Sequence, residues 1–202
     1  MSDRRERKRI QTRKALLEAA MSLFTERGIH ATRLEDITER ADLGKGAFYN
    51  YFDSKDALVA ELVGEGLDRL EREYLAGLDV NVPQRIAPVV AAHYAFFRDR
   101  PEYVMLFHQA RGILKVRTDG AATLQRVFRR YLEVLGRVVL PAGGEHVDEA
   151  ARVDVAAVVA GAVSGYLSFC LAAGLEPHAA TVERTLADGA LAARKRGPGE
   201  VG

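Results

Sequence analysis

The apolar residues of this chain recur at helical intervals along almost its whole length, and this spacing constrains the fold more than any other feature. Between residues 12 and 27, for example, Leu16, Ala20, Leu23 and Phe24 fall on one side of a helix. No run alternates between apolar and polar residues as a half-buried strand does. The sequence therefore predicts an all-α protein.

Helix boundaries follow from glycine, proline and capping residues. Gly28 and Gly174 are expected to end helices, Pro101 to begin one, and the Pro-Ala-Gly-Gly run at 141–144 to form a linker. Gly64 and Gly66 interrupt a long helix, which predicts either close packing or a bend there. The predicted helices span residues 12–27, 32–41, 45–52, 54–78, 83–98, 101–111, 121–140, 148–173 and 178–194, with a loop at 112–120.

Composition narrows the class of protein. Hydrophobic residues make up 48 % of the 202 residues, enough for a sizeable core, and the single cysteine excludes an internal disulfide. The N-terminus is charged, unlike a secretory signal. We find no uninterrupted apolar run of the ~18 residues that a membrane helix needs. These features predict a cytoplasmic protein with no membrane partner.

Charge is concentrated at the N-terminus. Residues 1–14 hold seven Lys or Arg against two acidic residues, whereas the whole chain has a net charge of +1. Such a segment suits contact with a polyanion, but a solvated terminus explains the charge equally well. It either extends the first helix backward or forms an arm against phosphates.

The stretch 43–55 has the most specific pattern in the chain. Phe48 and Phe52 lie four residues apart, so one face of a helix over 45–52 packs by two rings. The other face offers small, amide, aromatic and basic side chains, which suits a helix laid in a DNA major groove. With the preceding helix and the turn at 42–44, it forms a predicted helix-turn-helix.

Local signals support this arrangement. Thr32 with Glu35 is expected to form a capping box on the helix over 32–41. Asp42 is expected to take a positive φ in the turn, and Asp53 to cap the helix over 54–78.

The segment from residue 12 to residue 58 resembles the DNA-binding domain of the TetR family of bacterial transcriptional regulators. The resemblance covers about a quarter of the chain, and its strength lies in many small, aromatic and basic positions in register. The matching residues are Ala19, Ala20, Phe24, Gly28, Ala31, Thr32, Asp36, Ile37, Ala41, Lys45, Gly46, Phe48, Tyr49, Tyr51, Phe52, Ser54, Lys55 and Leu58.

Three positions depart from the family pattern. Thr38 stands where a small alanine is usual, and Asp42 replaces a turn glycine. Gly44 replaces a Ser or Thr that would cap the next helix and touch phosphate, so no side-chain phosphate contact is expected there.

The resemblance implies a set of DNA contacts. Lys45, Tyr49, Tyr51 and Lys55 would mainly hold phosphates, whereas Asn50 suits an adenine edge. Ala47 suits contact with a thymine methyl group. For Tyr49 and Tyr51, the alternative to a phosphate contact is packing within the domain. The full predicted set is Thr32, Arg33, Lys45, Gly46, Ala47, Tyr49, Asn50, Tyr51 and Lys55.

The rest of the chain predicts a second domain. We assign residues 1–53 to the DNA-binding domain with its basic arm, 54–196 to a helical effector-binding and dimerisation domain, and 197–202 to a disordered tail. Polar residues on aromatic faces suggest a small-molecule pocket, although such residues are more often ordinary core. The candidate ligand contacts are His93, Phe97, Phe107, His108, Arg111, Phe128, Tyr131, Tyr166 and Cys170.

The resemblance implies a homodimeric repressor that a small-molecule effector releases from a palindromic operator. The aromatic and aliphatic residues of the second domain suggest that this effector is hydrophobic or amphipathic. The last two long helices, over 148–173 and 178–194, would pair with those of a second copy as a four-helix bundle, and an intramolecular core helix is the alternative. The alternative function is that of an architectural DNA-binding protein that responds to no ligand. We find no phosphate loop, metal-ligand spacing or nucleophile motif, so no enzyme, cofactor or metal is expected.

Overall fold

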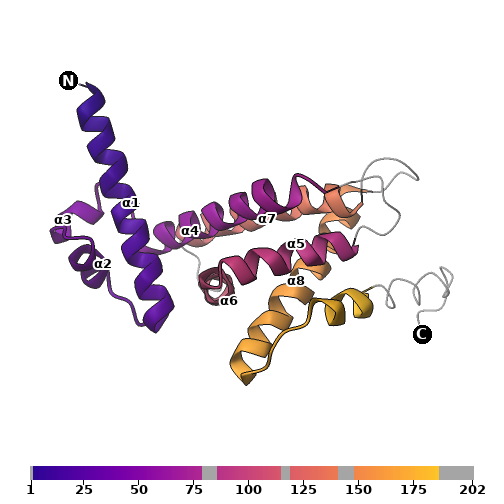
Figure 1. Ribbon diagram of the computed structural model, residues 1–202. Helices are drawn as coiled ribbons and strands as arrows, with labels where there is room; N and C mark the ends of the chain where they lie inside the picture. The colour runs from indigo at the N-terminus through magenta and orange to yellow at the C-terminus, as the bar shows by residue number, and fades with distance from the viewer. Residues whose placement is uncertain (1, 79–85, 115–118, 141–147, 187–202) are drawn as a thin grey trace. The chain divides into compact units, whose positions relative to one another are not determined.

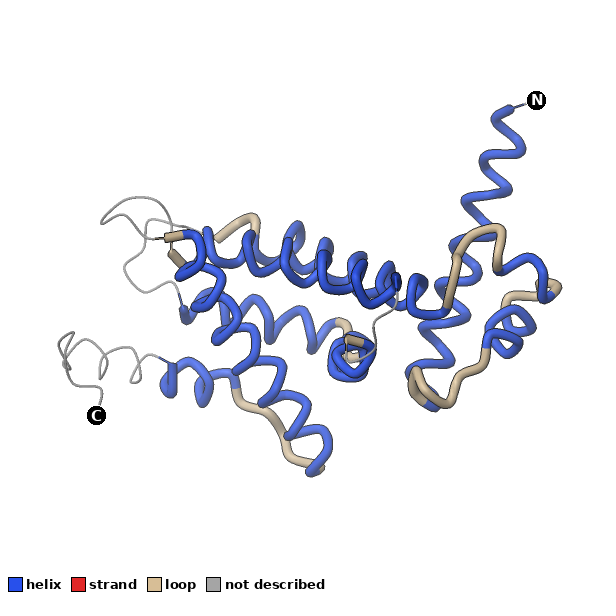
Figure 2. Tube along the Cα trace, turned by 180° about the vertical axis from the view of Figure 1, so that it is seen from behind, coloured by secondary structure: helices blue, strands red, loops and turns tan. Residues whose placement is uncertain are grey.

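The computed structural model describes residues 2–78, 86–114, 119–140 and 148–186, and this part of the chain contains helices and no strand (Figures 1 and 2). The all-α prediction is confirmed. Residues 179–186 are also helical. The helices are α1 (Ser2–Arg27), α2 (Leu34–Arg40), α3 (Lys45–Phe48), α4 (Lys55–Leu70), the π-helix η1 (Glu71–Leu75), α5 (Ile86–Asp99), α6 (Glu102–Ile113), α7 (Asp119–Val139) and α8 (Glu149–Ala173).

Helix α1 begins ten residues earlier than the apolar pattern requires, because the basic segment continues the helix instead of forming a separate arm. Gly28 and Gly174 end α1 and α8 with φ of 85° and 65°, as expected for helix-stopping glycines. Helix α6 runs through Gly112 to Ile113, so the predicted loop at 112–120 is too long. The linker at 141–144, the start of the helix over 83–98, the end of the helix over 178–194 and the tail at 197–202 lie outside the described residues.

The chain forms two compact units, each made of two segments. Unit 1 contains residues 1–66 and 101–128, and unit 2 contains residues 67–100 and 129–202. The boundaries between the units fall within α4 and within α7. The predicted boundary at residue 53 is different, because it divides the chain by function and not by packing.

Unit 1 has a core in which α1 packs against α2 and α6. Leu16, Ile37, Phe48 and Leu58 are at most 1 % exposed. Gly66 of α4 shows close packing of helices, since a Cβ atom there would lie 2.3 Å from the Tyr103 ring. The predicted close approach is confirmed at Gly66 but not at Gly64, where the nearest atom of Val127 is 3.8 Å away.

Unit 2 contains α5, α8 and the C-terminal part of α7. A Cβ atom on Gly136 would lie 2.8 Å from the backbone oxygen of Arg152, so α7 and α8 approach closely there. The buried residues of α5 include Val89, Phe96 and Phe97.

Helix α8 is long and apolar enough to cross a membrane, by length and composition alone. The expectation that no segment qualifies is therefore wrong, because residues 155–175 carry no charge. Only 28 % of its most apolar window is buried in this chain, and Val158 and Phe169 are 61 % and 79 % exposed. Part of this helix is thus exposed to solvent.

Candidate nucleic-acid interface

The helix-turn-helix is built on two buried rings. Phe48 and Phe52 are 1 % and 4 % exposed, with ring centroids 5.6 Å apart. Burial of this pair holds the segment against the core, and Lys45, Tyr49 and Asn50 of the same segment are exposed.

Helix α3 is shorter than predicted. It has α-helical geometry only over Lys45–Phe48, and the chain continues as a turn in which the N–H of Asn50 donates to the Ala47 carbonyl at 3.2 Å. The N–H of Phe52 still donates to the Phe48 carbonyl at 3.0 Å, which keeps the two rings on one side. Tertiary burial of both rings, rather than helix propensity, holds this segment.

The predicted conformation of Asp42 in the connecting turn is confirmed, but the predicted capping residues of α2 and α4 are wrong. Asp42 has φ of 55°, which confirms the expected left-handed residue. The N-cap of α2 is Arg33 instead of Thr32, and the Asp36 carboxylate accepts the Arg33 N–H at 2.9 Å. Helix α4 is capped by Ser54 instead of Asp53, because the Ser54 hydroxyl accepts the Ala57 N–H at 3.1 Å.

The predicted DNA contacts differ in how far they reach the surface. Lys45, Gly46, Tyr49, Asn50 and Arg33 are exposed. Ala47, Tyr51 and Lys55 are half-buried. A Cβ atom on Gly44 or Gly46 would have no neighbour within 4 Å, so the backbone is open to a ligand there.

Thr32 is the one predicted DNA contact that is buried, at 1 % exposure. Its hydroxyl donates to the Gly28 carbonyl at 2.8 Å and lies 3.4 Å from that of Leu23. The side chain thus closes the turn after α1, which explains why it does not cap α2.

Lys55 is tied to the same turn. Its ammonium donates to the carbonyls of Ile29 and Thr32, at 2.8 and 2.9 Å. Burial lowers the pKa of this amine. An ammonium has three hydrogens, so one remains for a phosphate.

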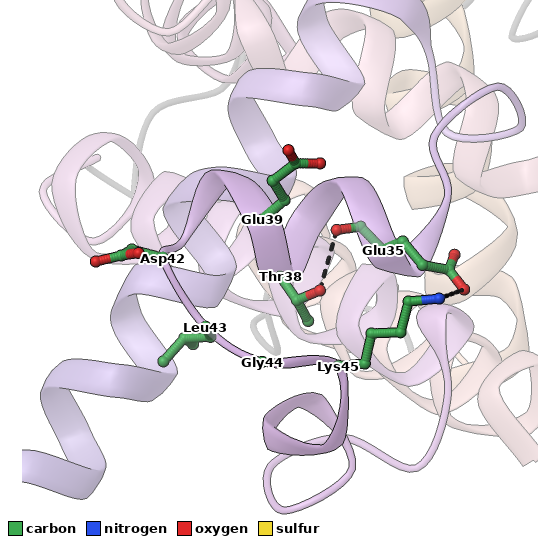
Figure 3. Close-up of a pocket in the computed structure, with 7 residues that line it drawn as sticks. All are labelled: Glu35, Thr38, Glu39, Asp42, Leu43, Gly44 and Lys45. Atoms are coloured by element: carbon green, nitrogen blue, oxygen red, sulfur yellow. Dashed lines mark hydrogen bonds and ion pairs between the residues drawn. The ribbon is translucent and has the colours of Figure 1, made fainter.

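A pocket lies where α2 meets the turn before α3 (Figure 3). The Lys45 ammonium lies 3.3 Å from Oε1 of Glu35, and Nε of Arg33 lies 3.9 Å from Oε2 of the same carboxylate. The Thr38 hydroxyl donates to the Glu35 carbonyl at 3.0 Å. The residues lining the pocket are Glu35, Thr38, Glu39, Asp42, Leu43, Gly44 and Lys45.

Sequence reasoning missed three residues that shape this region. Glu35 has only a capping role in the prediction from sequence. Arg13 forms a two-pronged ion pair with Glu61 and places its guanidinium 5.0 Å from the centre of the Phe52 ring. Gln109 of α6 accepts the Ile29 N–H at 2.7 Å. Helical spacing carries no signal for these contacts, most of which join residues far apart in sequence.

The predicted ligand contacts fall in both units. In unit 2, His93 and Tyr131 are buried and hydrogen-bonded to each other. Nδ1 of His93 lies 2.7 Å from the Val89 carbonyl, which only accepts, so Nδ1 carries the hydrogen and Nε2 accepts from the Tyr131 hydroxyl. Burial lowers the pKa of His93 to about 4 and raises that of Tyr131.

The other residues of unit 2 that are predicted to contact a ligand are buried or hydrogen-bonded within the unit. Phe97 and Cys170 are buried, and the half-buried Tyr166 accepts the His178 N–H at 3.0 Å. These contacts are those of ordinary core residues, so a ligand role for them is still a prediction.

In unit 1, Phe107 is buried against Tyr103, with ring centroids 5.5 Å apart. His108 and Arg111 are exposed, and Phe128 is half-buried. Partial burial of the guanidinium lowers the pKa of Arg111.

Comparison with known proteins identifies the N-terminal segment. Residues 16–62 match the model of the family described as "Bacterial regulatory proteins, tetR family". The HTH-type transcriptional repressor KstR2 of Rhodococcus jostii (strain RHA1) is 41 % identical over 71 residues, which are 33 % of this chain and 35 % of that protein. The aligned part thus spans about a third of the length of this relative.

Two solved structures share the fold over most of the chain. One is the transcriptional regulator FadR from Bacillus subtilis in complex with stearoyl-CoA, with a TM-score of 0.64, 14 % identity, and 85 % and 94 % of the two chains covered. The other is AibR in complex with isovaleryl coenzyme A and operator DNA, with a TM-score of 0.60, 16 % identity, and 87 % and 95 % covered. At these identities the likeness concerns the fold alone.

Proposed function

We propose that this chain is a homodimeric transcriptional repressor of the TetR type rather than an enzyme, because residues 16–62 match the model of that family. The observation that carries the proposal is the exposure of Lys45, Tyr49 and Asn50 in the same segment that buries Phe48 and Phe52. In a dimer, two copies of this surface would meet successive major grooves of a near-palindromic operator. A cytoplasmic location belongs to the proposal.

The residues of this surface divide by chemistry. Lys45, Arg33 and the free hydrogen of Lys55 suit phosphates, which position the protein without reading sequence. Asn50 presents an exposed amide that suits the two-hydrogen-bond contact to adenine, and Ala47 suits a thymine methyl. Sequence preference would then depend mainly on Asn50.

We further propose that a hydrophobic or amphipathic effector binds the helices after residue 54 and releases the DNA. Solved relatives of the same fold bind stearoyl-CoA or isovaleryl coenzyme A, so acyl thioesters are the first class to test. An effector can shift the protein between two states only by its different affinity for them, and α4 would connect the two functions.

The test is in vitro selection of DNA duplexes by the full-length protein, followed by binding measurements. We expect an inverted repeat, with Asn50→Ala relaxing preference at one base position in each half-site. Acyl-CoA esters of graded chain length are then tested for a thermal shift and for release of the selected duplex. Selection of no repeat, with no thermal shift, would favour the architectural DNA binder instead.

A further inference from the structure

Glu35 places a negative charge between two cations of the proposed DNA-binding surface. Its Oε1 lies 3.3 Å from the Lys45 ammonium and its Oε2 lies 3.9 Å from Nε of Arg33, so each carboxylate oxygen faces one cation. All three side chains reach solvent, with exposed fractions of 43 %, 79 % and 78 % for Glu35, Lys45 and Arg33. Figure 3 shows the contact between Glu35 and Lys45 at the edge of the pocket.

The fold fixes the position of this carboxylate. Glu35 lies in the first turn of α2, where an acidic side chain also stabilises the helix. Its own backbone N–H, and then the Lys45 ammonium, lower the pKa of the Glu35 carboxyl, so it is charged at neutral pH. The Thr38 hydroxyl holds the backbone carbonyl of the same residue.

A carboxylate in this place opposes DNA binding in two ways. It occupies the two cations that are to meet phosphates, and it repels an approaching phosphate. Exposed ion pairs are weak, so phosphates can displace Glu35, but each displacement reduces the net free energy that the new phosphate pair contributes. The base contacts assigned to Asn50 and Ala47 do not involve Glu35.

We propose that Glu35 is a positioning residue that restrains DNA affinity by holding Lys45 and Arg33 in the free protein. The inference rests on the proposed function, since it assigns both cations to phosphates. The restraint acts on the sequence-independent part of binding, which comes almost entirely from phosphate contacts. It lowers the affinity for operator DNA and for other DNA alike.

Helix α2 also supplies a matched control. Glu39 lies about one turn further along α2, lines the same pocket and is exposed. Among the ion pairs of the described residues, its carboxylate is paired with neither Lys45 nor Arg33. Glu39→Gln therefore removes the same charge from the same face without releasing either cation.

The experiment measures binding of the full-length protein to a selected duplex and to a scrambled duplex over a range of salt concentrations. We expect Glu35→Gln to bind both duplexes about fivefold more tightly at 0.1 M salt, because phosphates no longer have to displace a carboxylate from the two cations. The slope of log K against log salt should stay about the same, since the same cations meet phosphates in both proteins. Glu39→Gln should change the affinity much less. Equal effects of the two variants on affinity would overturn the inference.

A double-mutant comparison tests whether Glu35 acts through the two cations. In a variant that carries Lys45→Ala and Arg33→Ala, measured at low salt, the increase in affinity from Glu35→Gln should fall to that from Glu39→Gln. An increase that persists in full would mean general repulsion and would reject the positioning role. If the wild-type protein binds neither duplex, the proposed function fails and the inference fails with it.

Discussion

At the scale of single residues, Lys55 is held by the protein before any DNA is present. Its ammonium bridges the carbonyls of Ile29 and Thr32, so it ties the start of α4 to the turn after α1. The same side chain is predicted to hold a phosphate with its remaining hydrogen. A structural role and a DNA-binding role can be separated, because they change different measurements.

We predict that Lys55→Ala lowers the free energy of unfolding by roughly 1–3 kcal/mol, the usual cost of losing hydrogen bonds from a charged donor. It should also weaken DNA binding uniformly across sequences and lower the salt slope by about 1. Denaturant unfolding and salt-dependent binding measure the two effects. Lys14→Ala, at an exposed site of α1, is the stability control. Lost stability with an unchanged slope would leave Lys55 as a purely structural residue.

His93 makes the stability of the protein depend on pH. Its pKa in the folded protein is about 4, against 6.5 as the ordinary value, because burial disfavours the charged imidazole. The unfolded chain therefore binds the proton more tightly between these values, so the stability present above pH 6.5 is lost as the pH falls towards 4. The loss is about 3 kcal/mol at most, at roughly 1.36 kcal/mol for each pKa unit.

We predict that denaturant unfolding will show this loss for the wild-type protein between about pH 7 and pH 4.5, and a much smaller loss for His93→Gln. His108→Gln, which changes an exposed histidine of α6, should keep the wild-type pH dependence. If His93→Gln and the wild-type protein lose the same stability on acidification, the assignment to His93 is incorrect.

At the scale of elements, two glycines two residues apart on α4 have opposite surroundings. A Cβ atom on Gly66 would lie 2.3 Å from Cε1 of Tyr103 and 3.1 Å from Cζ of Phe107, and both rings are buried. On Gly64 the nearest atom, from Val127, would be at an ordinary contact distance.

We predict that Gly66→Ala destabilises the protein by roughly 1–3 kcal/mol, because a buried ring must move. Gly64→Ala should instead stabilise it by up to about 1 kcal/mol, since alanine is the better helix former. Thermal unfolding of the two variants provides the comparison. A stabilised Gly66→Ala variant would show that the α4–α6 packing adjusts freely.

Elements also show the limit of local signals. The spacing of Phe48 and Phe52 correctly predicts which face of α3 is buried, but not that the α-helix ends at Phe48. Asp42 has the expected positive φ, because the turn itself requires it. The predicted caps at Thr32 and Asp53 are wrong, because a hydroxyl or carboxylate near a helix start has several possible partners and the folded chain selects among them.

At the scale of the whole molecule, α8 has a face that the other described residues leave uncovered. Val158 and Phe169 are exposed, and Cβ atoms on Gly161 and Gly165 between them would meet no other described atom within 4 Å. The spacing of these four residues places them along one side of the helix. Small and apolar residues in this arrangement suit close approach of a second copy, as the proposed homodimer requires.

We predict that the wild-type protein sediments as a dimer and that Phe169→Glu shifts it to a monomer, since a buried unpaired charge is costly. Analytical ultracentrifugation measures the mass. Leu114→Glu, at a moderately exposed apolar site after α6, is the matched control and should remain dimeric. A dimeric Phe169→Glu variant would place the interface elsewhere, and recovery of the wild-type protein only from membranes would mean that α8 meets lipid.

The sequence by itself determined the all-α class, the positions of most helices and the residues that face the core of the helix-turn-helix. These properties depend on periodicity and on backbone preferences within a few residues, which any window of the chain displays. The tertiary structure decided that the Thr32 hydroxyl is buried, that Lys55 holds two carbonyls of a turn 23 and 26 residues away, and that Glu35 faces both Arg33 and Lys45. Most such contacts join residues distant in sequence, and all depend on where folding places charged side chains, so no local pattern contains them.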